Sequence, residues 1–277
     1  MGVDLHIHST ASDGTLSPEA IVHEATRLGL LGIAITDHDE VCGSQEAVRI
    51  GEIVGLTVVP AVEISTDLGE IEAHILGYWI ELKNERLLER LQEIRNARLR
   101  RAGRIIERLH AEGVEAISLD DVIREARGGI ICRPHVAAAL VRAGVCHDAQ
   151  EAFRRFLSRS APAYVPRIRP TTVEAIEIIR EAGGCPVLAH PGLIPHCHEI
   201  IEEMRALGVE GVEAFYPKHT PAQVSEFIAR AQAAGLLVTG GSDSHGPGGT
   251  EPVAIGSGNA PDSCLEALQQ WRCRRRN

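Results

Sequence analysis

The stretch VDLHIHSTASDG, residues 3–14, decides how the rest of the chain is interpreted. Its first five residues are apolar at alternate positions and predict a β-strand. His6 and His8 are two residues apart, so both side chains leave the same face of this strand near its end. The loop that follows adds the carboxylate of Asp13 and, with Gly14, a residue that eases a tight turn. Two imidazoles and a carboxylate so placed are candidate ligands for a metal ion.

Other short apolar runs end in, or contain, His, Asp or Glu. These runs are GIAIT (32–36) before Asp37 and His38, LTVVPAVEI (56–64) with Glu63, EAHILGYWI (72–80) with His74, CPVLAH (185–190) with His190, and LLVTGGSD (236–243) with Asp243, two residues before His245. Helical patterns lie between the runs, as in residues 17–29, where Ser17 is the expected N-cap. This alternation predicts an α/β fold with a mostly parallel sheet or barrel. Since such folds gather the carboxyl ends of their strands on one rim, we expect these polar side chains to meet there.

Residues 82–165 break the alternation and are predicted to form successive helices, at 84–111, 119–127, 134–143 and 148–157. We therefore expect a barrel domain made of 1–81 and 166–277, with a helical insertion domain at 82–165. Residues 80–170 hold 18 Lys and Arg against 12 Asp and Glu, whereas the rest of the chain holds 10 against 26. The asymmetry favours a basic segment that serves an anionic ligand. A helical surface with a chance excess of arginine is the alternative.

Composition narrows the class of protein. No apolar run approaches the roughly 20 residues that a membrane-spanning helix needs, and the first residues lack the pattern of a secretory signal. Seven dispersed cysteines without a CxxC pair suit a reducing compartment, so we expect a cytoplasmic protein. Aromatic residues make up only 3% of the chain, which leaves few platforms on which bases could stack.

Four segments carry a family resemblance: VDLHIHSTASDG, AITDHD, LAHPG and GGSDSH occur in this order and resemble the signature segments of the PHP (polymerase and histidinol phosphatase) phosphoesterases. The resemblance implies a distorted (β/α)7 barrel with three divalent metal ions. It places the first metal on His6, His8, Glu63 and Asp243, the second on Glu63, His74 and His190, and the third on Asp13, His38 and His245. Glu63 and His74 lie outside the four segments, so their assignment depends on order and strand position. The family favours Mn²⁺, and these nitrogen and oxygen ligands also suit Fe²⁺ or Zn²⁺.

The resemblance is nearest to the branch that contains 3′,5′-nucleotide bisphosphate phosphatases and 5′→3′ exonucleases acting on short RNA. It implies removal of the 3′-phosphate from 3′,5′-bisphosphonucleotides, such as 3′-phosphoadenosine 5′-phosphate, by a metal-bridging hydroxide. Asp243 is expected to be catalytic as well as a ligand, and His219 to assist the leaving oxygen, although a surface histidine is equally compatible with the sequence. The residues expected to bind the substrate, chiefly its second phosphate, are Arg133, His135, Lys218 and His219.

Three other functions are compatible with parts of this pattern. An exonuclease on short oligonucleotides would differ mainly in an open cleft beyond the second phosphate. A histidinol-phosphate phosphatase would need an acidic surface for its amine-bearing substrate, which the arginine-rich insertion disfavours. A non-catalytic PHP scaffold would be expected to lack ligands, yet all nine expected positions hold competent ones. The expected partner is thus a small anionic phosphate ester, with no membrane and no obligate protein partner indicated.

Overall fold

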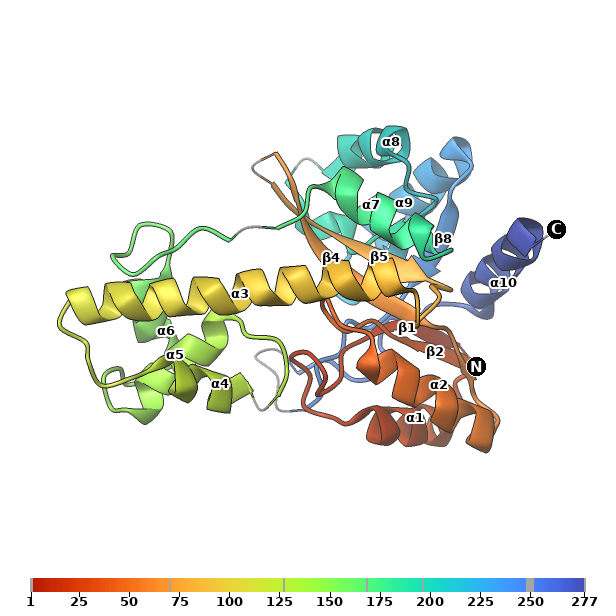
Figure 1. Cartoon of the computed structure of the whole chain (residues 1–277). Coiled ribbons are helices and arrows are strands. Elements are labelled where there is room, and N and C mark those ends of the chain that lie inside the picture. Colours follow the sequence, from red (N-terminus) through yellow and green to blue (C-terminus); the bar gives the residue numbers. More distant parts are fainter. Residues whose placement is uncertain are drawn as a thin grey trace. The chain divides into compact units, whose positions relative to one another are not determined.

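The computed structural model describes residues 2–69, 71–126, 128–167, 169–195, 197–247 and 252–276. The chain divides into two compact units, of which one consists of Met1–Arg90 with Pro170–Asn277 and the other of Leu91–Arg169. All the strands that the structure describes belong to the first unit, and the second unit is helical (Figure 1). The role of the helical segment as an insertion domain, with the bounds 82–165, stays a prediction.

The strands of the first unit form two sheets. The three-stranded sheet contains β1 (Val3–Ile7), β2 (Gly32–Ile35) and β3 (Thr57–Val58), all parallel. The five-stranded sheet contains, in order, β4 (Ala61–Leu68), β5 (Ile71–Tyr78), β6 (Cys185–Leu188), β7 (Gly211–Phe215) and β8 (Leu237–Gly240). In this sheet β5 runs antiparallel to both of its neighbours, and the remaining pairs are parallel. The predicted α/β class is therefore confirmed.

The predicted closed (β/α)7 barrel is not confirmed, because the ladders among the described residues stay in two sheets. The predicted strand at 56–64 is divided, with β3 ending two residues before Pro60 and β4 beginning one residue after it. Proline has no N–H to donate to a ladder, which accounts for the interruption. Isolated parallel bridges do join the two sheets, between Ile7 and Ser244 and between His38 and Glu63.

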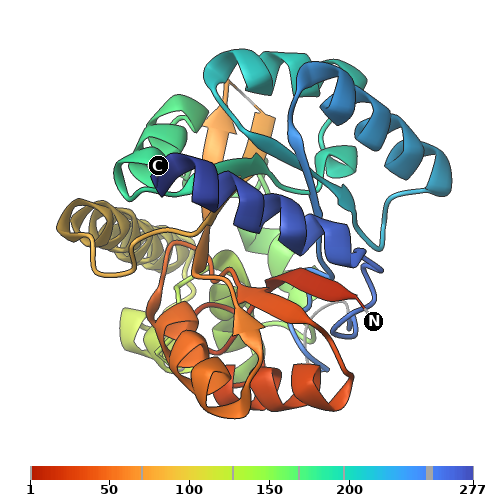
Figure 2. The same ribbon diagram turned by 90° about the vertical axis from the view of Figure 1, so that its right-hand side faces the viewer.

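Helices cover both sides of the strands in the first unit (Figure 2). They are α1 (Pro18–Arg27), α2 (Cys42–Val54), α7 (Thr172–Glu181), the 3₁₀ turn η2 (Pro191–Leu193), α8 (Cys197–Leu207), α9 (Pro221–Ala234) and α10 (Asp262–Arg276). The predicted N-cap of α1 is confirmed, since the Ser17 side chain accepts from the backbone N–H of Ala20. One apolar core lies between α1, α2 and the three-stranded sheet and includes Ile21, Ile33 and Ile50. None of the helices that the structure describes is long and apolar enough to cross a membrane.

The second unit is a small helical bundle with its own core. Its elements are α3 (Glu85–Ala111, which begins in the first unit), α4 (Leu119–Ala126), α5 (Arg133–Arg142), α6 (Ala149–Ala152) and a π-helical turn η1 (Phe153–Leu157). These agree with the four predicted helices to within about one residue, apart from the π turn. Leu109, Val122, Leu140 and Leu157 are fully buried in its core. The helical pattern of the sequence thus reflects a compact unit that buries apolar surface of its own.

Candidate metal centre

Nine side chains from six strands and the loops after them converge in the first unit. His6 lies in β1, Glu63 in β4 and His74 in β5, whereas the others follow the ends of β1, β2, β6 and β8. Those others are His8, Asp13, His38, His190, Asp243 and His245. The structure groups these nine residues into four overlapping sets whose ligand atoms lie within 4.8 Å of one another. It therefore brings together every ligand expected from the sequence, as the shared rim of an α/β fold requires.

Glu63 lies at the centre of the cluster and is completely buried. Its Oε2 atom lies 3.0 Å from Nδ1 of His38 and 3.2–3.3 Å from Nε2 of His6 and His8. Its Oε1 atom lies 2.8 Å from Nδ1 of His74 and 3.4 Å from Nε2 of His190. The two carboxylate oxygens thus face different groups of imidazoles, which is the arrangement that a bridging carboxylate needs.

The first predicted ligand set has the spacing of a coordination shell. Nε2 of His6 lies 3.2 Å from Nε2 of His8. Both nitrogens lie 3.1–3.4 Å from Oδ1 of Asp243 and 3.2–3.3 Å from Oε2 of Glu63. Two ligand atoms that are each about 2.1 Å from one ion lie about 3.0–3.4 Å apart at octahedral to tetrahedral angles. These four atoms therefore match the donor spacing of a divalent-cation site.

In the third predicted set the distances between ligand atoms are longer than in the first. Two of the imidazoles near Asp13 also contact Glu63. Asp13 lies 3.4 Å from Nε2 of His245, 3.8 Å from Nδ1 of His8 and 4.0 Å from Nε2 of His38. The second ring nitrogen of both His8 and His38 faces Glu63 instead. Because these two rings lie between groups, the division of the nine ligands among three ions stays a prediction.

Several buried polar atoms of the cluster have no hydrogen-bond partner. Among the described residues they include Nδ1 of His8 and His38, Oε2 of Glu63, and Nδ1 of His190. A buried polar atom without a hydrogen bond lowers the stability of the folded state. A cation coordinated by these nitrogen and oxygen atoms would remove that destabilisation for the atoms that face it. Imidazole and carboxylate ligands without a thiolate suit Mn²⁺, Fe²⁺ or Zn²⁺. The residues present therefore fit the divalent metals that were predicted.

In the metal-free protein the carboxylates and imidazoles of the cluster stabilise each other's charged forms. Burial acts to raise the pKa of Glu63, but the surrounding imidazoles, with His38 first, hold it well below its usual value. Burial acts to lower the pKa of His8, but the neighbouring carboxylates of Asp243 and Glu63 raise it to about 10. The pKa of His74 is likewise raised to about 9, against burial, by the charge of Glu63.

These shifts predict how the stability of metal-free protein depends on pH. Unfolded histidine has a pKa of about 6.5, so between about pH 6.5 and 10 the folded chain binds more protons at His8 and His74 than the unfolded chain. The contribution of protonated His8 and His74 to the free energy of unfolding is therefore complete below about pH 6.5 and is lost as the pH rises through 9 to 10. We expect the melting temperature of chelator-treated protein to fall across this range. Mn²⁺-loaded protein, whose ligands are already deprotonated, should show a smaller fall, and equal slopes for the two forms would contradict this linkage.

A layer of buried acids, of which Asp37 was expected at the rim from the sequence and Glu213 was not, lies beside the nine candidate ligands. Asp37 accepts hydrogen bonds from the hydroxyls of Ser9 and Ser12, both at 2.6 Å, and so fixes the loop that carries Asp13. Glu213 in β7 contacts His6 and the backbone of His190. The available signal was an acid inside an apolar run, as in GVEAF (211–215), because a buried carboxylate needs partners.

The His219 side chain lies next to this layer. It is buried, its Nδ1 donates to the carbonyl of Ala214 at 2.8 Å, and its Nε2 accepts from the N–H of Gly192 at 3.1 Å. Burial lowers its pKa, which favours the neutral ring that this pair of bonds requires. His219 can therefore assist a leaving oxygen only if one of these bonds breaks first. Lys218 beside it is exposed.

Arg133 and His135 belong to the second unit. Arg133 is the first residue of α5, and its guanidinium donates to the carbonyl of Leu157 while lying 5.6–5.8 Å from the ring centroids of Phe153 and Tyr164. His135 lies one turn into the helix, where its Nδ1 accepts from the backbone N–H of Cys132. Both side chains thus cap or line the N-terminus of α5, an end that favours anions.

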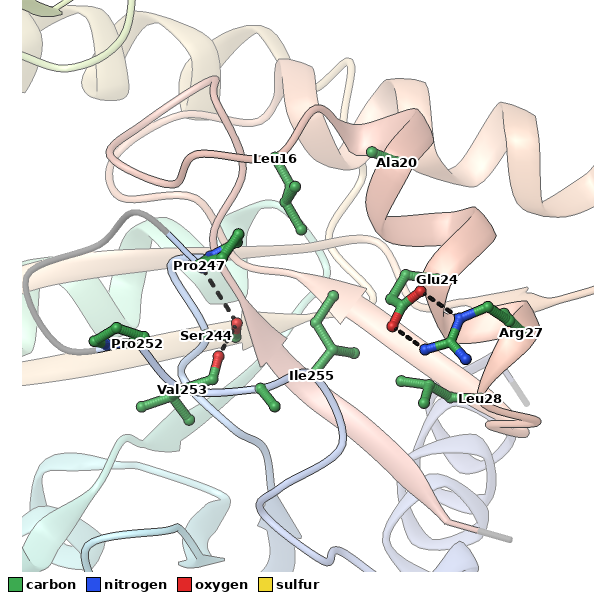
Figure 3. A pocket seen from close by; sticks show the side chains of 12 residues that line it. Leu16, Ala20, Glu24, Arg27, Leu28, Ser244, Pro247, Pro252, Val253 and Ile255 are labelled. Carbon is green, nitrogen blue, oxygen red and sulfur yellow. Dashed lines mark hydrogen bonds and ion pairs between the residues drawn. The ribbon is translucent and has the colours of Figure 1, made fainter.

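A largely apolar pocket of about 680 Å³ is lined by residues that include Leu16, Ser244 and Ile255 (Figure 3). Ser244, which lies between Asp243 and His245 in the sequence, donates to the carbonyl of Val253 and accepts from the N–H of Gly246. The Glu24–Arg27 ion pair lines another side of the pocket. None of the nine ligands lines this pocket, so it is not assigned to the metal site.

The fold and the cluster together define the class of the protein. A buried array of imidazoles and carboxylates with divalent-cation spacing, placed at the ends of α/β strands, is the type of site that metal-dependent phosphoesterases use. Residues 4–157 match the PHP domain family, and the chain belongs to that family.

The relatives of this chain include named hydrolases. It is 34% identical to the 5′-3′ exoribonuclease Rnm of Escherichia coli, over 88% of this chain and 85% of that one. It is 33% identical to the 3′,5′-nucleoside bisphosphate phosphatase of Chromobacterium violaceum, over 89% and 88% of the two chains. A crystal structure of an inferred metal-dependent phosphoesterase from Bifidobacterium adolescentis superimposes with a TM-score of 0.84 at 34% identity, covering 98% and 96% of the two chains. The chain is accordingly a phosphoric ester hydrolase.

Proposed function

We propose that this protein removes the 3′-phosphate of 3′,5′-bisphosphonucleotides, such as 3′-phosphoadenosine 5′-phosphate, and releases a nucleoside 5′-monophosphate and phosphate. The observation that carries the proposal is the nine-residue cluster around Glu63, which has the donors and spacing of a polynuclear divalent-metal site. The bisphosphate phosphatase named among the relatives supports this choice of substrate.

In this proposal the cluster would hold three divalent ions, with Mn²⁺ as the favoured metal. As the family resemblance implies, His6, His8, Glu63 and Asp243 would hold the first, Glu63, His74 and His190 the second, and Asp13, His38 and His245 the third. The structure groups the same nine residues differently, because it places Glu63 with His6 and His190 and also with His38 and His74. The bound ions would supply an activated water and neutralise charge on the phosphoryl oxygens. The protein's own contribution is to hold the donors rigidly. Asp243, for example, accepts a hydrogen bond from the hydroxyl of Tyr216 at 3.2 Å, and its N–H donates to the carbonyl of His6.

We propose that Arg133 and His135 are the main ligands of the second phosphate, and Lys218 remains a candidate from the sequence. The Arg133 guanidinium is held in place by two aromatic rings and a carbonyl. Burial, together with the positive charge of Arg133, lowers the pKa of Arg101 to about 10. Guanidinium groups held close enough to repel each other gain from a shared anion, and phosphate suits their geometry.

Two further expectations from the sequence, the barrel that the resemblance implies and a cytoplasmic location, are part of the proposal. The two sheets are read as halves of a distorted (β/α)7 barrel, because the parallel bridges at Ile7 and His38 continue from one sheet to the other. A cytoplasmic location is supported by the free thiols of all seven cysteines.

A phosphate-release screen with Mn²⁺ tests the substrate directly. It should compare 3′-phosphoadenosine 5′-phosphate, histidinol phosphate and a short 5′-phosphorylated RNA, and we expect the bisphosphate to react fastest. The second candidate is a 5′→3′ exonuclease, which the E. coli relative favours and which would digest the RNA faster. A preference for histidinol phosphate would reject both assignments. Failure to hydrolyse any ester, together with failure to bind Mn²⁺, would favour a non-catalytic scaffold.

The leaving-group dependence of a His219→Asn variant tests how His219 acts. An asparagine amide can replace Nδ1 as donor to Ala214, but it does not reach Gly192. Because the wild-type Nε2 already accepts a hydrogen bond, we expect a loss of about tenfold in kcat on both p-nitrophenyl phosphate and the bisphosphate. His219→Gln, whose longer amide can still accept from Gly192, should lose less. A general acid would instead give a loss of about 10²–10⁴ confined to the poor leaving group, and that pattern would support the role predicted from the sequence.

A further inference from the structure

Glu213 is a buried glutamate whose two carboxylate oxygens contact two different metal-ligand residues. It lies in the middle of β7 and is completely buried. Its Oε1 lies 3.0 Å from Nδ1 of His6, and its Oε2 accepts the backbone N–H of His190 at 2.8 Å. His6 comes from β1 and His190 follows β6, so one side chain on β7 links two separate strands of the site.

The contact with His6 determines which ring nitrogen faces the cluster with a free lone pair. A carboxylate can only accept a hydrogen bond, so Glu213 requires the proton of His6 to be on Nδ1. The opposite nitrogen, Nε2, is the one that lies among His8, Glu63 and Asp243. A neutral imidazole protonated at Nδ1 offers its Nε2 lone pair to a metal.

The contact with His190 restrains an unfavourable backbone conformation. His190 has φ 26° and ψ 58°, within the left-handed region that residues other than glycine rarely adopt. Such a conformation persists only where its surroundings hold it in place. The hydrogen bond from the His190 N–H to Glu213 does so from within the core. Nε2 of His190 then lies 3.4 Å from Oε1 of Glu63.

We propose that Glu213 is a positioning residue of the metal centre, which sets the tautomer of His6 and the backbone of His190 through one carboxylate. This inference rests on the proposed metal centre and goes beyond it by assigning a residue outside the nine ligands. Glutamine is the informative replacement because it keeps the shape and removes one acceptor. If the amide oxygen stays on the His190 N–H, its NH₂ faces Nδ1 of His6 and forces the proton onto Nε2. If the amide is reversed, two N–H groups oppose each other at His190.

The test compares Mn²⁺ binding by the full-length wild type, Glu213→Gln and the control Glu210→Gln, each stripped of metal first. Glu210 precedes β7 and bonds Trp271 and Arg275, away from the ligands. Removing an outer partner of a ligand typically costs 10–100-fold in metal affinity. By titration calorimetry we expect the dissociation constant for Mn²⁺ to be at least tenfold higher in Glu213→Gln than in the wild type, and unchanged in Glu210→Gln. The melting temperature of the metal-free forms separates this effect from a merely structural one, which would lower stability and leave the affinity of folded protein unchanged.

A second measurement keeps the proposal testable if Glu213→Gln does not fold. In Zn²⁺-loaded wild type, the ¹⁵N imidazole spectrum should show His6 with its proton on Nδ1 and none on Nε2. A proton on Nε2, or equal Mn²⁺ affinity in wild type and Glu213→Gln, would overturn the role of Glu213 and leave the metal centre intact. Failure of the wild type itself to bind Mn²⁺ would reject both.

Discussion

Glu63→Gln should reduce kcat/KM for phosphoester hydrolysis by at least about 1,000-fold and lower the metal content of the purified protein. The carboxylate is fully buried, and its two oxygens face imidazoles on both sides, three near Oε2 and two near Oε1. Glutamine replaces one oxygen by an NH₂ group, which cannot coordinate a cation. Since losing only an outer partner of a ligand costs about 10–100-fold, losing Glu63, the proposed bridging ligand, should cost more. Phosphate release and elemental analysis of the same preparations measure the two effects.

Two further variants show whether the loss comes from the bridging position. Glu63→Asp keeps the charge but shortens the side chain by one methylene, so we expect partial retention of metal with low activity. Glu210→Gln removes a carboxylate from the same unit, away from the cluster, and should behave as wild type. Full metal content and activity in Glu63→Gln would show that Glu63 does not bridge.

The nine residues of the cluster could be selected from the sequence because the apolar runs and the family's signature segments mark their positions. Most of them follow or end an apolar run, and the carboxyl ends of strands in an α/β fold share one rim. Glu63 and His74 lie inside their runs and were assigned from the order of the family's segments. Glu213 could not be identified in this way. Its place inside the apolar run GVEAF indicates that it needs partners, but these partners, His6 and His190, lie 207 and 23 residues away along the chain. Its role follows only from the alignment of three strands.

The positions of the helices and of most strands could be predicted, because hydrophobic periodicity specifies them. The helices and most strands follow their apolar patterns, and Ser17 begins α1 as its side chain predicts. The strand β4 differs, because it continues through the polar residues Ser65, Thr66 and Asp67 and pairs antiparallel with β5. Polar residues within a strand hide its length from a pattern of apolar residues. Whether eight strands close into one barrel depends on register between distant segments, which no local pattern contains.

Arg133→Ala should raise the KM for 3′-phosphoadenosine 5′-phosphate by on the order of 100-fold, while changing the KM for a 3′-monophosphate less than about threefold. The proposed guanidinium–phosphate contact is charged, and losing such a hydrogen bond costs about 1.5–3 kcal/mol, or more than tenfold in affinity. The monophosphate has no second phosphate to lose. Arg133→Lys should fall between the two, because lysine keeps the charge but not the two-pronged geometry. Steady-state kinetics with both substrates gives the required comparison.

The matched control is Arg142→Ala, which removes an exposed arginine from the other end of the same helix, where it pairs with Glu125. Arg133 also packs between two rings, so its loss can loosen the helical unit. Thermal unfolding of each variant measures that contribution separately. A loosened unit would affect both substrates and would be matched by a lower melting temperature. If the KM values of bisphosphate and monophosphate rise together while stability is unchanged, Arg133 does not recognise the second phosphate, and the preference for bisphosphates must come from residues of the first unit such as Lys218.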